Sequence, residues 1–496
     1  MGFTAVLCHW LTEMAAFLTE SGGVLLFCSI RFWAVFVVFL AGYALLRYSR
    51  RGAMMAYVVA FGLFLAFKAN GLLMLLLPFT AVATWMLVNC LREAVGTVPR
   101  RAWLAFIVVL NFVPLIYFKY ANFLGASLAA MVGSNFSPWK IALPVGISFY
   151  TFQSVSYVVD VYRGTFRLRP TLLEFLFYLT FFPLLLAGPI TRAATLIPQM
   201  RRLGCVASHM VWYGVWLFIC GLLKKAVCAD YLAQFVNLVY DDPVAYSGFE
   251  NLMATAGYTL QIYLDFSGYS DMAIGLAAML GFRLRDNFNA PYQSLNVSEF
   301  WRRWHISLST WFRDYLYIPL GGNRKGMART YANNFLTMVV AGVWHGASWM
   351  FVIWGAMHGA ALVVHKFCKR LFLVALPASW WLKASAWVLT TVFVMAAWVF
   401  FRAPDLTVAA SVFARIFTDF DWAYLVPFVQ VRWLWCLVMV VAAVCHTPAV
   451  TRCAPRLAAA FVCAPWVVKF VVFVCTVQLA VEAGQSTVQP FIYAQF

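Results

Sequence analysis

The feature that most constrains this chain is a series of uninterrupted apolar runs, each close to the length that crosses a lipid bilayer. Crossing about 30 Å of hydrocarbon takes roughly 20 apolar residues. Only 11% of the residues are charged and 64% are hydrophobic, whereas soluble domains are about 25% charged and about 45–50% apolar. The sequence therefore predicts a polytopic membrane protein and excludes a cytosolic enzyme. The runs lie at 24–46, 53–68, 71–90, 102–118, 171–188, 210–228, 252–281, 331–349, 350–367, 381–401, 431–446 and 464–483.

The helix count and the domain organisation follow from these runs. We expect an all-α membrane protein with about 11 transmembrane helices. The stretch 143–160, LPVGISFYTFQSVSYVVD, contains Pro and Gly and forms either a full or a broken span. The sequence has no repeat of fixed period and no hydrophilic insertion long enough to fold alone. We therefore predict a single membrane domain over residues 1–496.

Charge and cysteine usage exclude several classes of partner. The 36 Lys and Arg outnumber the 18 Asp and Glu, but they form short clusters rather than the continuous basic stripe of a nucleic-acid-binding face. The 12 cysteines contain no C-x-x-C pair, so we expect no zinc site and no other bound metal. Arg clusters in short loops mark the cytoplasmic side. Loops 47–51 and 92–101 are separated by two spans, which predicts that both face the cytoplasm and that Met1 faces outward.

Polar residues at membrane depth are costly, so those retained are candidates for function. The first group is YLDFSGYSDMAIG at 263–275, which contains Asp265 and Asp271. Gly268 and Gly275 fall on the same helical face as Asp271, and small residues there permit close helix packing. The two carboxylates either bond to neighbouring helices or belong to a site, and the residues leave both alternatives open.

The second group is SEFWRRWHISLSTWFRDYLYIPLGGNRKG at 298–326. Helical spacing of its aromatic residues and His305, with Ser298 as the N-cap, predicts a helix over about 299–316. Trp and Tyr flanked by Arg are typical of the membrane interface. The guanidinium groups of Arg302, Arg303 and Arg313 suit either the phosphates of a bound substrate or lipid headgroups. From spacing alone, His305 is as consistent with a structural role as with a catalytic one.

The third group is AGVWHGASWMFVIWGAMHGA at 341–360. His345 lies in an uncharged aromatic run beside Trp344, so its imidazole needs a polar partner or a substrate-filled cavity. Gly346 removes side-chain bulk and allows a substrate or another backbone to come close. His358 is a candidate for a supporting or a packing role.

These motifs together resemble the membrane-bound O-acyltransferase (MBOAT) family, and specifically its bacterial alginate O-acetyltransferase branch. The resemblance runs from about residue 20 to the end and is densest over 144–360. It is carried by PVGISFYTFQSVSYVVDVYRG, FFPLLLAGPITRAATLIPQM, YLDFSGYSDMAIG, NFNAPYQSLNVSEFWRRWHISLSTWFRDYLYIPLGGNR, VWHGASWMFVIWGAMHG and the terminal QPFIYAQF.

The resemblance implies a fold, a site and partners. The family's signature membrane histidine maps onto His345, and its second marked polar position maps onto His305. The implied architecture is a ring of helices around a central funnel, with re-entrant or interfacial helices, in the bacterial inner membrane. An activated acyl group passes through the funnel, and an exported SGNH-type acetyltransferase completes transfer to a polysaccharide. Teichoic-acid D-alanyl transferases, which take their acyl group from a carrier protein, are the sibling branch.

The chemistry needs a base for the hydroxyl proton and donors for the developing oxyanion. We expect His345 to be the general base and His305 to position a substrate, with Asp265, Asp271, Arg302, Arg303, Arg313, Trp344 and His358 in binding or supporting roles. The sequence contains no G-x-S-x-G elbow, which favours direct transfer. We expect no tightly bound cofactor; the donor is acetyl-CoA or an acyl-carrier-protein thioester. One alternative, from another class, is a polysaccharide or lipid transporter or flippase without acyl-transfer chemistry. The other is a D-alanyl transferase of the teichoic-acid type.

Overall fold

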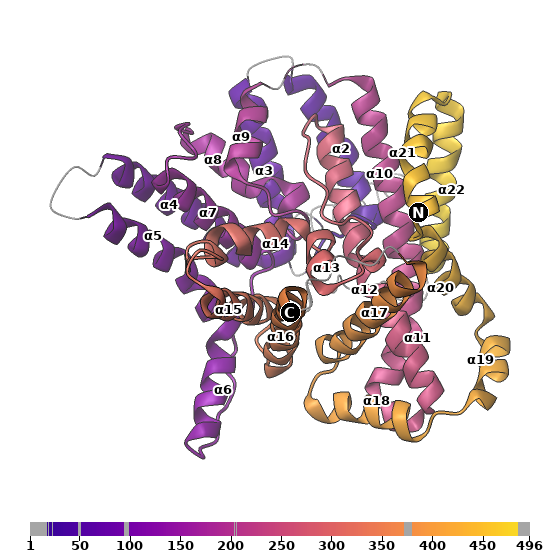
Figure 1. Ribbon diagram of the computed structural model, residues 1–496. Helices are drawn as coiled ribbons and strands as arrows, with labels where there is room; N and C mark the ends of the chain where they lie inside the picture. The colour runs from indigo at the N-terminus through magenta and orange to yellow at the C-terminus, as the bar shows by residue number, and fades with distance from the viewer. Residues whose placement is uncertain are drawn as a thin grey trace. The chain divides into compact units, whose positions relative to one another are not determined.

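The computed structural model describes residues 17–484 except 18, 22, 48–50, 94–98, 203, 205 and 372–378. The described residues are helical and contain no β-strand (Figure 1), which confirms the prediction of an all-α polytopic membrane protein. Parts of both predicted cytoplasmic loops, Met1 and the terminal QPFIYAQF motif lie outside the described residues. The prediction that Met1 faces outward therefore stays a prediction.

The described chain forms two compact units. The first, here the N-terminal unit, comprises residues 1–122, 136–186 and 192–201; the second, the C-terminal unit, comprises 123–135, 187–191 and 202–496. The prediction of a single domain over 1–496 stays a prediction.

The N-terminal unit is a bundle of helices packed around aromatic side chains. Phe39 stacks on Phe61, and the ring of Phe182 meets both edge-on. The predicted span 143–160 begins as a turn, with Gly146 at φ +87°, and becomes helical at Ile147. The elements are α2 (Ile30–Arg47), α3 (Arg51–Asn70), η1 (Gly71–Leu75), α4 (Leu76–Glu93), α5 (Arg100–Leu115), η2 (Ile116–Tyr120), α7 (Ile147–Tyr162), α8 (Leu172–Thr180), η3 (Phe182–Leu184) and α9 (Ala193–Arg201); α6 (Ala121–Met131) falls mostly in the other unit.

The C-terminal unit is built around one long, almost wholly buried helix, α12 (Gly248–Met279). The helices α10, α11, α17 and α18 all contact it. The other elements are α10 (Ser208–Leu222), η4 (Leu223–Ala229), α11 (Asp230–Asp241), η5 (Pro243–Ala245), η6 (Pro291–Gln293), α13 (Val297–Arg303), α14 (Ile306–Phe312), η7 (Arg313–Tyr317), α15 (Met327–His345), α16 (Trp349–Leu371), α17 (Trp380–Arg402), α18 (Leu406–Thr418), η8 (Trp422–Tyr424), α19 (Leu425–Val431), α20 (Trp433–Cys445), α21 (Pro448–Cys463) and α22 (Trp466–Gly484).

Glycine contacts set the distance between α10 and α12. A Cβ atom on Gly268 would lie 2.8 Å from the carbonyl oxygen of Gly221, and one on Gly275 would lie 2.5 Å from that of Gly214. Such distances are too short for any larger residue without movement of the helices. The close helix approach predicted from the small residues of 263–275 is confirmed.

Six helical segments of the described chain are long and apolar enough to cross a membrane, or up to seven if a bent pair is one span. The predicted number of about 11 is not confirmed. Two of the predicted runs do not form one straight helix in the structure. The run 171–188 contains the nine-residue helix α8 followed by a turn, and the segment holding α20 bends by 98° relative to the helical segment before it.

Candidate active site

The predicted continuous helix over 299–316 is wrong, because the chain breaks at Trp304 and His305. Helix α13 ends at Arg303, α14 begins at Ile306, and His305 between them has the left-handed backbone angles φ 41° and ψ 56°. A non-glycine residue in that region costs on the order of 1–3 kcal/mol, so its surroundings must hold it there. The N-cap of α13 is Asn296, whose side chain accepts from the backbone N–H of Glu299, and is not Ser298.

Asn287 holds the His305 imidazole in place. Its Oδ1 lies 3.1 Å from Nδ1 of His305 and also accepts the backbone N–H of Ser307 at 3.2 Å. Because that oxygen is an acceptor, Nδ1 of His305 carries the proton and Nε2 carries the lone pair. Burial lowers the pKa of His305 to about 3, so the ring is neutral near pH 7. Sequence reasoning missed Asn287, although it stands inside the NFNAPYQSLN motif.

His345 is the last residue of α15 and is buried among aromatic rings. Its ring centroid lies 5.0 Å from that of Trp354 and 5.3 Å from that of Phe401. The close approach predicted beside His345 is made by another residue of this protein, since a Cβ on Gly346 would overlap the Phe351 ring. Gly346 is therefore required for packing of α16 against the end of α15.

Two tryptophans connect the three predicted histidines. The Trp344 ring centroid lies 5.0 Å from that of His345 and 6.2 Å from that of His305. Trp354 lies 5.0 Å from His345 and 4.9 Å from His358. His305, His345 and His358, all buried, thus belong to one aromatic-lined centre, which we call the histidine centre.

His358 is anchored by another tryptophan. The indole Nε1–H of Trp301 donates to Nδ1 of His358 at 3.3 Å. An indole nitrogen is a donor only, so the proton of the neutral His358 ring sits on Nε2. That Nε2 is buried and has no hydrogen-bond partner among the described residues. Nε2 of His358 is therefore a hydrogen-bond donor, whereas Nε2 of His305 is an acceptor.

Asp265 and Asp271 lie in ion pairs that join α12 to η4. Asp265 lies 2.5 Å from Nζ of Lys225, which also lies 2.7 Å from Asp230. Asp271 lies 2.6 Å from Nζ of Lys224. This arrangement favours the structural alternative for both carboxylates. The lysines escaped sequence analysis because they stand alone in the long apolar run 210–228.

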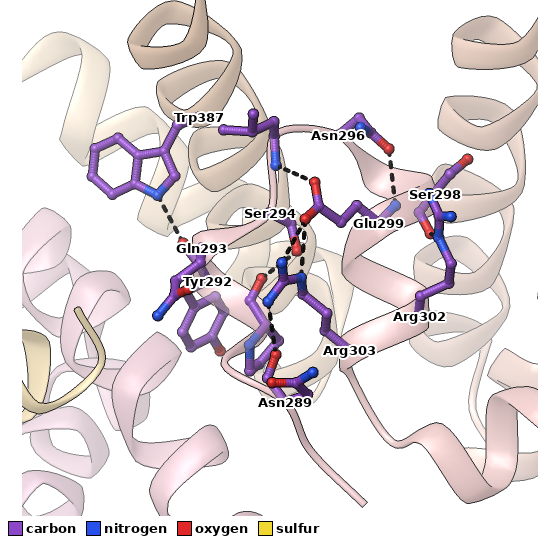
Figure 2. Close-up of polar contacts among 12 residues, drawn as sticks. Asn289, Tyr292, Gln293, Ser294, Asn296, Ser298, Glu299, Arg302, Arg303 and Trp387 are labelled. Carbon is purple, nitrogen blue, oxygen red and sulfur yellow. Dashed lines mark hydrogen bonds and ion pairs between the residues drawn. The ribbon is translucent and has the colours of Figure 1, made fainter. Parts of the chain in front are cut away.

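The three predicted arginines have different surroundings. Arg303 forms an ion pair with Glu299 at 2.8 Å and donates to the backbone of Asn289, as Figure 2 shows. Arg302 is exposed and donates to the carbonyl of Ser298. Arg313 is exposed and pairs with Asp314 at 2.8 Å. Only Arg302 and Arg313 therefore present a largely exposed guanidinium group.

These features define a class: a polytopic helical membrane protein with a buried, aromatic-lined histidine centre. Residues 166–412 match the membrane-bound O-acyltransferase family. The chain is 43% identical over 344 residues to a probable alginate O-acetylase of Azotobacter vinelandii, covering 68% of this chain and 67% of that protein. It is 36% identical over 342 residues to a peptidoglycan O-acetyltransferase of Helicobacter pylori, covering 63% and 64%, and 26% identical over 242 residues to a teichoic acid D-alanyltransferase of Bacillus subtilis, covering 47% and 61%.

The chain therefore belongs to the membrane-bound O-acyltransferase family and is an O-acyltransferase. The resemblance read from the sequence motifs is confirmed. Acyl transfer also replaces the transporter alternative, which had rested on the membrane spans and their interruptions rather than on a shared motif. The histidine centre falls within the matched residues.

Proposed function

We propose that the protein transfers an acetyl group from a thioester donor to hydroxyl groups of an exported or cell-surface polysaccharide. The relatives named for alginate and peptidoglycan O-acetylation support this acceptor class, since alginate and peptidoglycan both contain sugars with hydroxyl groups. The D-alanyl alternative is supported by lower identity over a smaller share of the chain. The observation that carries the proposal is the histidine centre, in which hydrogen bonds to Asn287 and Trp301 fix two imidazoles in opposite tautomers.

In this proposal His345 is the general base. It takes the proton of the acceptor hydroxyl as the hydroxyl oxygen attacks the thioester carbonyl carbon. The carbon–sulfur bond then breaks, and the proton passes to the departing thiolate. A positioned general base contributes about 10²–10⁴-fold to rate. Trp344 and Trp354 both meet the His345 ring edge-on and restrict its orientation.

His305 and His358 orient the reactants. Nε2 of His305 accepts a hydrogen bond from a second, non-reacting hydroxyl of the acceptor sugar, because Asn287 keeps the proton on Nδ1. Nε2–H of His358 supplies a buried donor, and a donor is what a developing oxyanion requires. The tautomers imposed by Asn287 and Trp301 thus suit the roles proposed for His305 and His358.

The donor is a cytoplasmic thioester, either acetyl-CoA or an acyl-carrier-protein conjugate, and Arg302 and Arg313 contribute to its entrance. Exposed guanidinium groups match the phosphates of CoA or of a phosphopantetheine arm; the competing role is contact with lipid headgroups. The family resemblance supports an exported SGNH-type acetyltransferase as the partner that completes transfer, and the bacterial inner membrane as the location.

The test is the O-acetyl content of the secreted polysaccharide at matched membrane levels of the protein. His345→Ala should reduce acetylation by about 10²–10⁴-fold, and His345→Gln should be almost as inactive because an amide is not a base near neutral pH. His209→Ala is the matched control, since His209 is an exposed histidine at the start of α10. Acetylation near the wild-type level in either His345 variant would remove His345 from the chemistry.

A further inference from the structure

A pocket of about 430 Å³ lies in the C-terminal unit between α12, α17 and α20. It is separate from the histidine centre, because the described residues that line it include none of the three histidines of that centre. The rest of its lining comes from η6 and from the turn between α20 and α21. The lining residues are Ala256, Thr259, Leu260, Tyr292, Gln293, Trp387, Thr391, Met395, Met439, Ala443, His446, Thr447 and Pro448.

The walls of this pocket suit hydrocarbon. The described lining contains no Asp, Glu, Lys or Arg, and Met395 on α17 and Met439 on α20 contribute flexible apolar side chains. Polar groups of the lining form hydrogen bonds within the protein. Nε1 of Trp387 donates to the carbonyl of Tyr292 at 2.7 Å (Figure 2), and Nε2 of Gln293 donates to the carbonyl of His446 at 2.7 Å. These N–H groups are already hydrogen-bonded within the protein, so they add little to the affinity for a polar ligand.

The surroundings of the pocket are those of a lipid-facing surface. Helix α17 is a candidate membrane span, and α20 belongs to the bent candidate span. Both helices expose apolar side chains next to the lining residues, with Leu389 73% and Val440 58% exposed. The rim residues Trp387 and Ala443 are themselves exposed. The pocket therefore opens between α17 and α20 toward the hydrocarbon of the bilayer.

We infer that this pocket binds an acyl chain of a bilayer phospholipid. A phospholipid chain is the apolar ligand that the bilayer supplies at high concentration, and water is disfavoured in an apolar cavity. The volume lies within the range of about 300–1,000 Å³ that is typical of small-ligand sites. This inference goes beyond the proposed function, because the chain is bound as a ligand and does not react.

The bound chain would brace the segment that carries His305. Tyr292 is both a pocket wall and a neighbour of Trp304, with ring centroids 6.1 Å apart. Its hydroxyl donates to the carbonyl of Thr259 at 2.6 Å and accepts from Nε1 of Trp398 at 3.2 Å. Filling the pocket thus supports η6, whose Tyr292 packs beside the break at Trp304 and His305.

The probe is phosphatidylethanolamine with a photoreactive diazirine in one acyl chain, incorporated into vesicles that contain the full-length protein. Labelling should concentrate on peptides that carry Met395 and Met439. Ala443→Trp places an indole in the pocket and should reduce that labelling by at least about tenfold. Val440→Trp is the matched control: it adds the same side chain to the exposed face of the same helix and should leave labelling of both methionine peptides unchanged.

Equal labelling in wild type and Ala443→Trp would overturn the inference and indicate surface lipid only. Thr391→Trp places an indole in the pocket from α17, so it keeps the test decisive if Ala443→Trp does not reach the membrane. Loss of labelling in Thr391→Trp supports a chain in the pocket, and unchanged labelling rejects it. Neither readout uses acetylation, so failure of this inference is distinguishable from failure of the proposed function.

Discussion

Nε1 of the Trp301 indole lies 3.3 Å from Nδ1 of His358, and its hydrogen bond fixes the tautomer of this buried histidine on another helix. Trp301 stands on α13 and His358 on α16, so the bond also ties the short helix before the His305 break to a candidate membrane span. The position of α13 therefore determines which nitrogen of His358 carries the proton.

Trp301→Phe keeps an aromatic ring but removes the donor, which leaves Nδ1 of His358 without its bond. A neutral hydrogen bond contributes about 0.5–1.5 kcal/mol net, so we expect a small fall in the midpoint of thermal unfolding in detergent. Acetylation should fall more than stability, because the Nε2–H tautomer of His358 is no longer imposed. Trp381→Phe, at an exposed position of α17, is the control. Loss of stability without any loss of activity at matched levels would assign Trp301 to packing alone.

Asn287 gives the prediction that concerns pH. Asn287→Asp keeps an acceptor at Nδ1 of His305 and adds a negative charge, which raises the pKa of His305 from its buried value of about 3. Activity in this proposal needs neutral His305, so it should be lost at a higher pH in Asn287→Asp than in the wild type as the pH falls. The measurement is the acid limb of the initial rate against pH.

Asn287→Leu is the companion variant for that experiment. Leucine has a similar volume but cannot accept from Nδ1 of His305 or from the backbone N–H of Ser307, which bonds Oδ1 at 3.2 Å. We expect activity to fall over the whole pH range with no shift of the acid limb. An acid limb that is identical in wild type and Asn287→Asp would show that His305 does not titrate in the rate-limiting step.

Sequence patterns predicted the fold class and the family better than the local geometry. Apolar run length and the motifs of 144–360 are properties of the local sequence, and both were sufficient for a helical O-acyltransferase. The left-handed His305 was not predictable from helical spacing, because the break depends on Asn287, which lies 18 residues away in sequence. Bonding of Asp265 and Asp271 to neighbouring helices was one of the two predicted alternatives. Their partners Lys224 and Lys225 were not identified, because they come from a different helical segment. Tertiary partners, rather than local propensity, set both features.

The close crossing of α10 and α12 predicts that alanine is more destabilising at Gly268 than at Gly52. Gly268→Ala places a Cβ 2.8 Å from the carbonyl oxygen of Gly221 and 3.0 Å from Cβ of Lys224. Overpacking of this kind costs about 1–3 kcal/mol, so the variant should show a lower unfolding midpoint and a lower level in the membrane. Gly52→Ala is the control, because a Cβ there has nothing within 4 Å. Equal behaviour of the two variants would mean that the crossing relaxes without cost.

The buried charges around Lys225 give the sharpest prediction of stability. Lys225 and Asp265 are almost fully buried, with side chains 3% and 2% exposed, whereas Lys224 and Asp271 are 31% and 23% exposed. Removing one partner of a buried pair costs about 3–5 kcal/mol, because the remaining charge is left uncompensated. Lys225→Met should therefore destabilise the protein far more than Lys224→Met, in which water still reaches the remaining carboxylate.

A triple variant separates charge from packing in this cluster. Asp230→Asn and Asp265→Asn, added to Lys225→Met, remove both carboxylates that the lysine faces at 2.7 and 2.5 Å. Replacing a whole buried ionic group by neutral residues is often tolerated, so the triple variant should recover much of the stability lost in Lys225→Met. The measurement is thermal unfolding of the purified protein together with acetylation at matched levels. Recovery of both would confirm a structural role for the cluster, whereas recovery of stability without activity would show that Lys225, Asp230 or Asp265 also supports the reaction.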